Sequence, residues 1–157
     1  MKLKHIVTVE EISLTELASL ISIGIEDSGY LLAEYDRAEY DALRDKSACD
    51  FREDRIARLL LAGKEIVIVD YNAEGETYDG AGLPAAVGGE GEARYTVDLK
   101  AILKGLSRTA SGEVAEEPAM AKKAFDAFLR DEEEPCFDAG EGDTLWQSIL
   151  FGEIIYG

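Results

Sequence analysis

Three stretches of the chain have the pattern of hydrophobic and polar positions that is typical of β-strands. Residues 3–9 alternate, so that leucine, histidine and valine side chains share one face. Residues 66–69 are consecutive β-branched residues, which indicates a strand covered on both faces and central in its sheet. Residues 93–97 alternate again, with Tyr95 and Val97 facing inward. We therefore expect a small sheet of about three strands.

About five further stretches have the apolar spacing of helices. The first has two possible starts, because Thr8 with Glu11 and Ser13 with Glu16 both have the spacing of a capping box. In that motif a hydroxyl and a carboxylate each satisfy a free backbone N–H. The start at Ser13 is preferred because the apolar residues after it then share one face, and Gly29 is expected to end the helix.

Each of the other helices is expected to begin at a capping residue or a proline. The expected first or capping residues are Asp50 (with Glu53), Asp98, Pro118 and Asp143, the last of these preceding a helix from Thr144. Gly63 is placed to end the second helix in the left-handed conformation, and Gly152 is expected to break the last helix near the C-terminus.

The segments between these elements lack a clear period. Residues 30–50 mix tyrosines with charges of both signs and are expected to form an exposed arm. Residues 72–92 are glycine-rich and are expected to form a long mobile loop, and residues 107–117 a linker. No internal repeat is present, so the prediction is a single α+β domain over residues 1–157, with about three strands packed by about five helices.

The composition is that of a folded protein with a strongly acidic surface. Hydrophobic residues make up 46% and charged residues 31% of the chain, which argues against disorder. The formal net charge is −17, and such a field repels nucleic-acid phosphates and anionic membranes. We therefore expect no direct contact with nucleic acid or membrane. The charge can serve solubility alone, and a basic protein surface is the partner that it suits.

No motif predicts a catalytic or metal centre. Cys49, Cys136 and His5 are too few for a four-ligand zinc site, and the glycine-rich loop lacks the lysine of a phosphate-binding loop. A non-catalytic protein with no cofactor and no metal is therefore expected. The pattern shows neither a signal peptide nor an apolar run of membrane-spanning length, which predicts a cytoplasmic protein.

Two sets of residues are candidates for binding. A ligand pocket between the first and last helices can be lined by Glu26, Tyr30, Trp146 and Glu153. The core is the preferred place for the aromatic members of that set, because the apolar C-terminal stretch is expected to be docked against the domain. The second set is an acidic run suited to a basic partner or to a solvated helix end, namely Asp131, Glu132, Glu133 and Glu134.

The C-terminal stretch DTLWQSIL followed by FGEIIYG resembles a family of small phage and mobile-element proteins that end in a similar Phe-Gly-Glu-Ile-Val-Tyr-Gly. ISLTELASLISIGIED is similar to the first helix of that family, with Ser13 at the cap and Glu26 near its end. AGKEIVIVD and YTVDLKAILKGL are similar to its strands and a following helix. The chain departs from the family's paired glycines and Asn-Tyr-Trp in having Asp-Ser-Gly-Tyr at residues 27–30. The resemblance covers most of the chain outside residues 30–50 and the linkers, and it implies an accessory role rather than an activity.

Two functional hypotheses are consistent with these patterns. The first is a non-catalytic accessory protein that binds a basic protein surface through its own acidic surface, with DNA mimicry or counter-defence as specific forms. The alternative is a protein that binds a small, nucleotide-like signal. The negative field disfavours such an anionic ligand unless an arginine or lysine lines the site.

Overall fold

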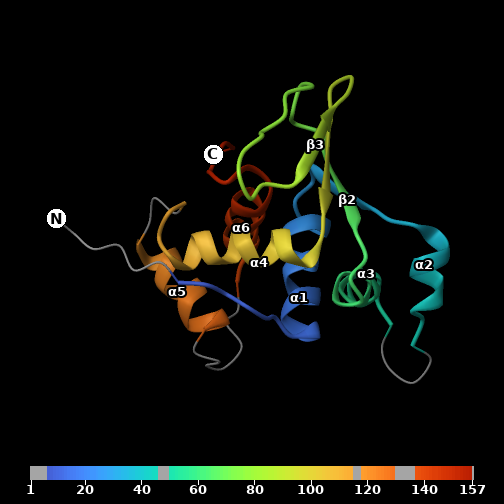
Figure 1. Cartoon of the computed structure of the whole chain (residues 1–157), viewed down its shortest axis with the longest axis horizontal. Helices are drawn as coiled ribbons and strands as arrows, with labels where there is room; N and C mark the ends of the chain where they lie inside the picture. Colours follow the sequence, from blue (N-terminus) through green and yellow to red (C-terminus); the bar gives the residue numbers. More distant parts are fainter. Residues whose placement is uncertain (1–6, 46–49, 115–117, 130–136, 157) are drawn as a thin grey trace.

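The structure is a computed structural model that describes residues 7–45, 50–114, 118–129 and 137–156. Helices pack against a four-stranded antiparallel sheet (Figure 1). The strands are β1 (Leu31–Glu34), β2 (Ile66–Asp70), β3 (Ala85–Gly88) and β4 (Ala93–Val97), and their order in the sheet is β1-β2-β4-β3. The α+β prediction is confirmed, and the sheet has one strand more than expected.

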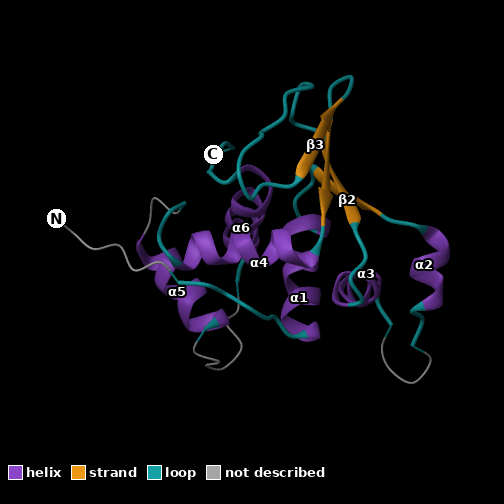
Figure 2. Cartoon of the chain, viewed as in Figure 1, coloured by secondary structure: helices purple, strands orange, loops and turns teal. Residues whose placement is uncertain are grey.

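The helical elements are drawn in purple in Figure 2. They are α1 (Leu14–Ile21), the π-helix η1 (Ser22–Glu26), α2 (Arg37–Ala42), α3 (Arg52–Leu61), α4 (Leu99–Ala110), α5 (Pro118–Phe128) and α6 (Ala139–Phe151). α6 packs against both α4 and η1, α1 packs against α3, and α5 lies on α4. Apolar residues of these helices and of the sheet form one continuous core.

The strand expected at residues 3–9 is not present in its described part. Residues 7–10 have no regular structure, and residues 1–6 lie outside the described residues. The backbone of this segment bonds to helix α4 instead: the Val7 N–H donates to Ser111 Oγ, the Ser111 hydroxyl donates to the Val7 carbonyl, and the Val9 N–H donates to Ser107 Oγ. These hydroxyls satisfy the polar groups that a neighbouring strand would otherwise satisfy.

The central strand is β2, as predicted. It lies between β1 and β4, and Ile66, Ile68 and Val69 are almost fully buried. Since Ile68 and Val69 point to opposite faces of the sheet, the strand is covered on both sides. β4 also has the predicted alternation, with Tyr95 and Val97 buried.

Residues 30–45 are not the exposed arm that was expected. Leu31–Glu34 pair with β2 in register Leu31↔Asp70, and the Leu31 and Ala33 side chains are buried. α2 follows, with the Tyr40 side chain buried and the Arg55 guanidinium over its ring at 4.8 Å. The mixture of tyrosines and charges in this segment therefore reflects a cation–π contact with α3. Residues 46–49 lie outside the described residues.

Two other expected connections contain regular structure. The glycine-rich segment 72–92 includes β3, which pairs with β4 through the register Val87↔Arg94. The expected linker begins inside α4, which continues to Ala110. The Ser107 hydroxyl donates to the Leu103 carbonyl and the Thr109 hydroxyl to the Gly105 carbonyl, so both side chains are accommodated within the helix.

Most of the predicted helix ends are confirmed. Ser13 caps α1 by accepting from the Glu16 N–H, and Asp98 caps α4 by accepting from the Ala101 N–H. α5 begins at Pro118. Gly63 and Gly152 follow α3 and α6 with φ of +83° and +73°.

Two predicted caps are wrong. α3 begins after Phe51, where the Asp54 carboxylate accepts from the Phe51 N–H at 3.1 Å. α6 begins at Ala139 rather than Thr144, because Asp138 and Glu141 form the capping box. Asp143 thus lies inside α6, which frees its carboxylate for contacts made elsewhere in the fold.

Candidate functional site

Two of the predicted ligand residues, Glu26 and Tyr30, line a cleft of about 370 Å³ beside the outer edge of β1. Arg52 of α3 and Tyr71, which follows β2, line the same cleft. The Glu26 side chain comes from the π-helix η1, a type of helix that is often found at functional sites. Partial burial, and then the nearby Glu53 carboxylate, raise the pKa of Glu26.

The other two predicted ligand residues lie away from this cleft. Trp146 is fully buried in the core, where its indole N–H donates to the Leu20 carbonyl at 2.8 Å. Its ring lies so close to the backbone of η1 that a Cβ on Gly24 would be 1.8 Å from Trp146 Cδ1. Glu153 is exposed beyond the end of α6. Trp146 fills the space between the first and last helices, so it cannot contact a ligand in an open pocket there.

Arg52 gives the cleft a positive charge that the sequence pattern did not reveal. Its Nη2 donates to the Ala33 carbonyl at 3.1 Å, its Nε donates to Tyr35 Oη at 3.3 Å, and its guanidinium lies over the Tyr35 ring. No carboxylate forms an ion pair with Arg52 within the described part of the chain. In the sequence, Arg52 stands at a helix start beside two acidic residues, and that pattern does not indicate that its side chain lines a cleft.

Behind the cleft, two tyrosines bond to buried or partly buried carboxylates. The Tyr30 hydroxyl donates to Asp143 Oδ1 and the Tyr156 hydroxyl donates to Asp70 Oδ2 at 2.7 Å. Asp70 is fully buried and also accepts from the Asn72 N–H. Burial, followed by these bonds to carboxylates, raises the pKa of both tyrosines well above the usual range. The tyrosines therefore act as hydrogen-bond donors at neutral pH.

Gln147 of α6 holds the C-terminal segment against the domain. Its side-chain oxygen accepts from the N–H groups of Ile155 and Tyr156, and its nitrogen donates to the Tyr156 carbonyl and to Asp143 Oδ2. The side chain is 1% exposed, and all of its bonding capacity is used. The expectation that the apolar C-terminal stretch docks on the domain is confirmed through residue 156.

The acidic run predicted to bind a partner, residues 131–134, lies outside the described residues. A different acidic surface is described at the far end of the sheet. It comprises Glu74, Glu76, Asp79 and Glu90, all of which are exposed, and we call it the acidic end. No lysine, arginine or histidine occurs between Lys64 and Arg94 in the sequence.

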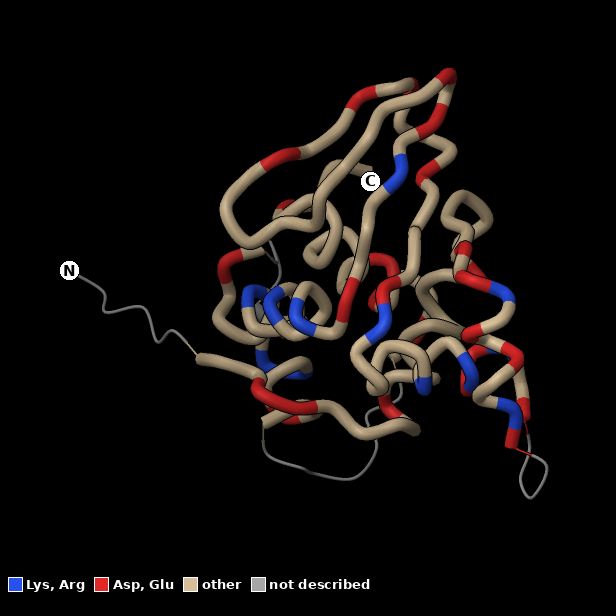
Figure 3. Tube along the Cα trace, turned by 45° about the vertical axis from the view of Figure 1, so that its right-hand side comes forward, with Lys and Arg blue, Asp and Glu red and all other residues tan. Residues whose placement is uncertain are grey.

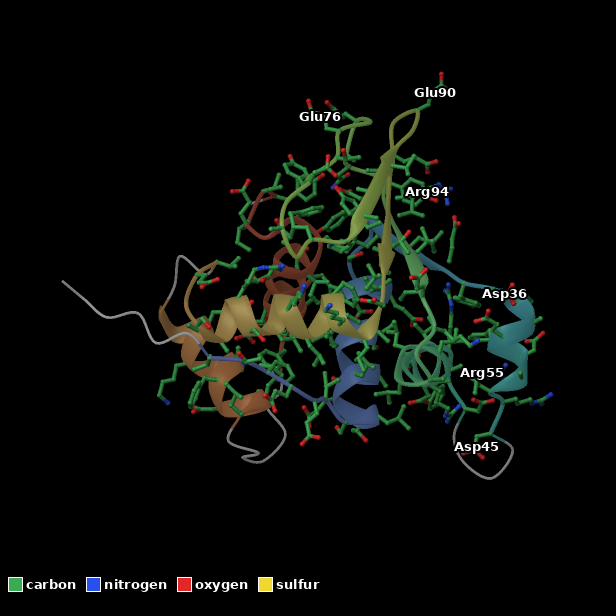
Figure 4. All side chains as sticks on the ribbon, in the orientation of Figure 1. Asp36, Asp45, Arg55, Glu76, Glu90 and Arg94 are labelled. Carbon is green, nitrogen blue, oxygen red and sulfur yellow. The ribbon has the colours of Figure 1, made fainter. Side chains whose placement is uncertain are left out.

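The acidic end projects from the rest of the molecule. Figure 3 shows the acidic residues along the loops at the top of the view, with a basic position below the hairpin turn. Figure 4 places Glu76 and Glu90 at the tips of two neighbouring loops, both pointing away from the sheet. Arg94 is engaged by Glu34 at 2.6 Å and Glu92 at 3.4 Å, so it does not neutralise the tips.

The loop that carries Glu74, Glu76 and Asp79 is tied to the helices. Arg108 of α4 donates from Nη2 to the Gly82 carbonyl at 2.8 Å and from Nη1 to the Ser148 carbonyl of α6 at 2.6 Å. Burial lowers the pKa of Arg108. This guanidinium joins the loop to α4 and α6, so the acidic end is attached to the core by charge-assisted hydrogen bonds.

The described residues contain neither a cluster suited to a metal ion nor a membrane-spanning helix. No group of three or more histidine, cysteine, aspartate or glutamate side chains there is placed to hold a metal ion. Within the same ranges, no helix is both long and apolar enough to cross a membrane. Cys49 and Cys136 lie outside them.

Comparison of the chain with protein-family models, with curated proteins and with solved structures found no match in any of the three.

Proposed function

We propose that this chain is an accessory protein that binds a basic surface of another protein through the acidic end. The observation that carries the proposal is the set of exposed carboxylates Glu74, Glu76, Asp79 and Glu90, in a stretch of sequence without a basic residue. Like charges held together on a projecting surface raise the local potential and attract a partner of opposite charge. Solubility alone requires no such gathering at one end.

An accessory role of phage or mobile-element type, with DNA mimicry as its specific form, is supported by the acidic end and by the similarity of the C-terminal stretch described above. Carboxylates on a projecting end can occupy a basic cleft that otherwise holds phosphates. The binding would then depend on salt and would be displaced by duplex DNA.

The test compares two double variants with the same change in charge. The protein is immobilised and incubated with a bacterial lysate, and the captured proteins are eluted with duplex DNA. Glu76→Gln with Glu90→Gln is expected to lose the DNA-eluted proteins, whereas Glu10→Gln with Glu11→Gln, at exposed positions elsewhere, is expected to retain them. Equal capture by both variants, or capture that salt does not weaken, would overturn the proposal.

A second candidate function is the binding of a small anionic ligand in the cleft beside β1. The observation in its favour is Arg52, which supplies the positive group that such a ligand requires, next to the half-exposed Tyr71 ring. Tyr30 and Tyr71 offer aromatic surface to a base, and Arg52 offers donors to a phosphate or carboxylate.

This second candidate is tested by thermal denaturation across a panel of nucleotides. A ligand of the cleft is expected to raise the melting temperature of the native chain and to have no effect on Arg52→Gln, since binding to the folded state alone stabilises it. Arg37→Gln is the matched control, because Arg37 is an exposed arginine on α2. A flat response across the panel would exclude the cleft as a nucleotide site.

A further inference from the structure

The two edges of the sheet differ in how well they are protected. β1 and β3 are the edge strands, so each has a row of backbone groups directed away from its neighbour. Exposed edges of this kind readily pair with another extended chain, and most proteins block them with charged side chains, prolines or covering segments. At β1 the outward groups bond to Ser28 and Arg52. At β3 the backbone of Gly75 lies against Gly88, but the outward backbone groups have no hydrogen-bond partner among the described residues.

At β1 the outward groups are partly occupied. The Tyr71 N–H donates to the Tyr30 carbonyl, so by strict alternation the outward residues of β1 are Leu31 and Ala33. The Leu31 N–H donates to Ser28 Oγ at 3.0 Å, and the Ala33 carbonyl accepts from Arg52. The Arg52 side chain therefore lies across this edge and obstructs a further strand.

At β3 the outward backbone groups are those of Ala86 and Gly88. The Gly89 N–H donates to the Glu92 carbonyl at the hairpin turn, so Val87 pairs with Arg94 in the next bonded position. The N–H and C=O groups of Ala86 and Gly88 then point away from β4. Among the described residues none of these four groups has a hydrogen-bond partner, and we call this row the β3 edge.

The side chains of β3 offer no protection either. The strand Ala-Ala-Val-Gly has no charged residue, and the Val87 side chain is 69% exposed. Arg94, opposite Val87 on β4, is paired with Glu34 and Glu92. The other charges next to the strand include those of the acidic end, at the hairpin turn and on the loop before the strand. A second copy of the chain would bring two acidic ends together, which is unfavourable. An extended segment with lysine or arginine side chains would meet opposite charge.

We propose that the β3 edge receives an extended, basic segment of a partner protein as an additional strand. Backbone bonds to Ala86 and Gly88 would align the segment, β-branched side chains would lie beside Val87, and lysine or arginine side chains would reach the acidic end. This inference rests on the proposed function and specifies how the partner is held. It predicts that binding depends on strand-forming ability as well as on charge.

Two end-capped peptides of equal charge separate these requirements. The alternating peptide has about eight residues, lysine alternating with valine and threonine, and the proline peptide has one central valine replaced by proline. Isothermal titration at low salt measures both against the full chain. The alternating peptide is expected to bind at least about tenfold more tightly, because the proline peptide cannot complete the backbone bonds.

A variant of the strand and a measurement on the native chain complete the test. Ala86→Pro removes an outward N–H and leaves the bonds between β3 and β4 in place, so it is expected to bind both peptides equally weakly. Its thermal melting curve shows whether it is folded. In the native chain, amide hydrogen exchange at Ala86 and Gly88 is expected to slow when the alternating peptide is bound, and this readout needs no variant.

The outcomes distinguish this inference from the proposed function. Equal, salt-sensitive binding of both peptides that Glu76→Gln with Glu90→Gln abolishes would keep the proposed function and overturn strand addition. No binding of either peptide at low salt would count against both. Concentration-dependent dimerisation that Ala86→Pro abolishes would assign the β3 edge to a second copy and overturn a basic partner. Preference for the alternating peptide, lost in Ala86→Pro, would support the inference.

Discussion

At the scale of single residues, the fold depends on two neighbouring side chains of α6, one closely packed and one fully hydrogen-bonded. Trp146 is the largest fully buried side chain, and its ring lies against the backbone of Gly24, where a Cβ would be 1.8 Å from Trp146 Cδ1. Gln147, its neighbour in sequence, uses every donor and acceptor of its amide to hold the C-terminal segment. The apolar pattern predicts burial of the segment, but an amide that serves four bonds at once is visible only in the structure.

The close contact at Gly24 gives a direct prediction for stability. Gly24→Ala is expected to destabilise the protein by about 2–3 kcal/mol, because the Trp146 ring must move and give up its bond to the Leu20 carbonyl. Gly140→Ala is the matched control in α6, since Gly140 is exposed and the nearest atom to a Cβ built there would be Asp138 Oδ1 at 3.4 Å. Alanine favours a helix, so the control should be neutral or stabilising in urea denaturation. Equal losses in both variants would contradict the prediction.

The bonds from tyrosines to carboxylates predict a loss of stability at high pH. The folded-state pKa values of Tyr30 and Tyr156 are raised, and burial raises the pKa of Tyr95 to about 12. Above about pH 10 the unfolded chain loses these protons while the folded chain keeps them, so the free energy of unfolding falls as pH rises. Urea midpoints measured from about pH 8 to about pH 11 should decline.

Tyr156→Phe tests the assignment. The variant is expected to be less stable at neutral pH, since Asp70 loses a donor, and to decline less steeply at high pH because one raised group is missing. Parallel curves for the variant and the native chain would show that Tyr156 does not contribute to the pH dependence.

At the scale of elements, strong local patterns predicted the structure well and pairing between distant segments was missed. The β-branched run of β2, the alternation of β4, and the caps at Ser13 and Asp98 are all signals contained in a few neighbouring residues. β3 is Ala-Ala-Val-Gly, which has little strand preference of its own and forms because β4 lies opposite. In the candidate site, Glu26 and Tyr30 both line the cleft beside β1, and Arg52 reaches it from the start of α3 through its bond to the Ala33 carbonyl.

Asp50 joins α3 to the segment before it, in a role that the capping prediction did not foresee. Its carboxylate accepts from Arg55 and Arg58, and the hydrogen bond with Arg55, followed by that with Arg58, lowers the pKa of Asp50 to about 2. Arg58 also donates to the Leu43 carbonyl after α2. The Arg58 bond and the ion pair of Arg55 with Asp41 at 3.8 Å therefore connect α3 to α2, in the region of Figure 4 where Arg55 lies between them.

This arrangement predicts an effect of acid on α2. A lowered folded-state pKa gives stabilisation that is present above about pH 4 and is lost as pH falls through about 2. Asp50→Asn should therefore speed amide exchange in α2 at neutral pH, and NMR titration should place the Asp50 carboxyl near the lower value. Glu10→Gln, at an exposed site far from α2 in sequence, is the control. Unchanged exchange in α2 would show that the ion pairs do not hold it.

At the scale of the whole molecule, charge acts on folding and on binding with opposite signs. A net charge of −17 destabilises the compact state through self-repulsion, while it strengthens the attraction to a basic partner. Salt screens both effects. The free energy of unfolding should therefore rise with salt, and the affinity for a basic partner should fall.

Urea denaturation from about 10 to about 200 mM NaCl tests the folding side, because the screening length shortens from roughly 30 Å to less than 10 Å over that range. The urea midpoint of the native chain should rise with salt. Glu76→Gln with Glu90→Gln should show a smaller rise, and so should Glu10→Gln with Glu11→Gln, because each pair of changes lowers the net negative charge of the chain. Binding depends on where the charges lie, so only the first pair should weaken it. If the two double variants affect folding alike but only Glu76→Gln with Glu90→Gln weakens binding, the acidic end has a role beyond solubility. A urea midpoint of the native chain that falls with salt would contradict the premise that repulsion limits the stability of the fold.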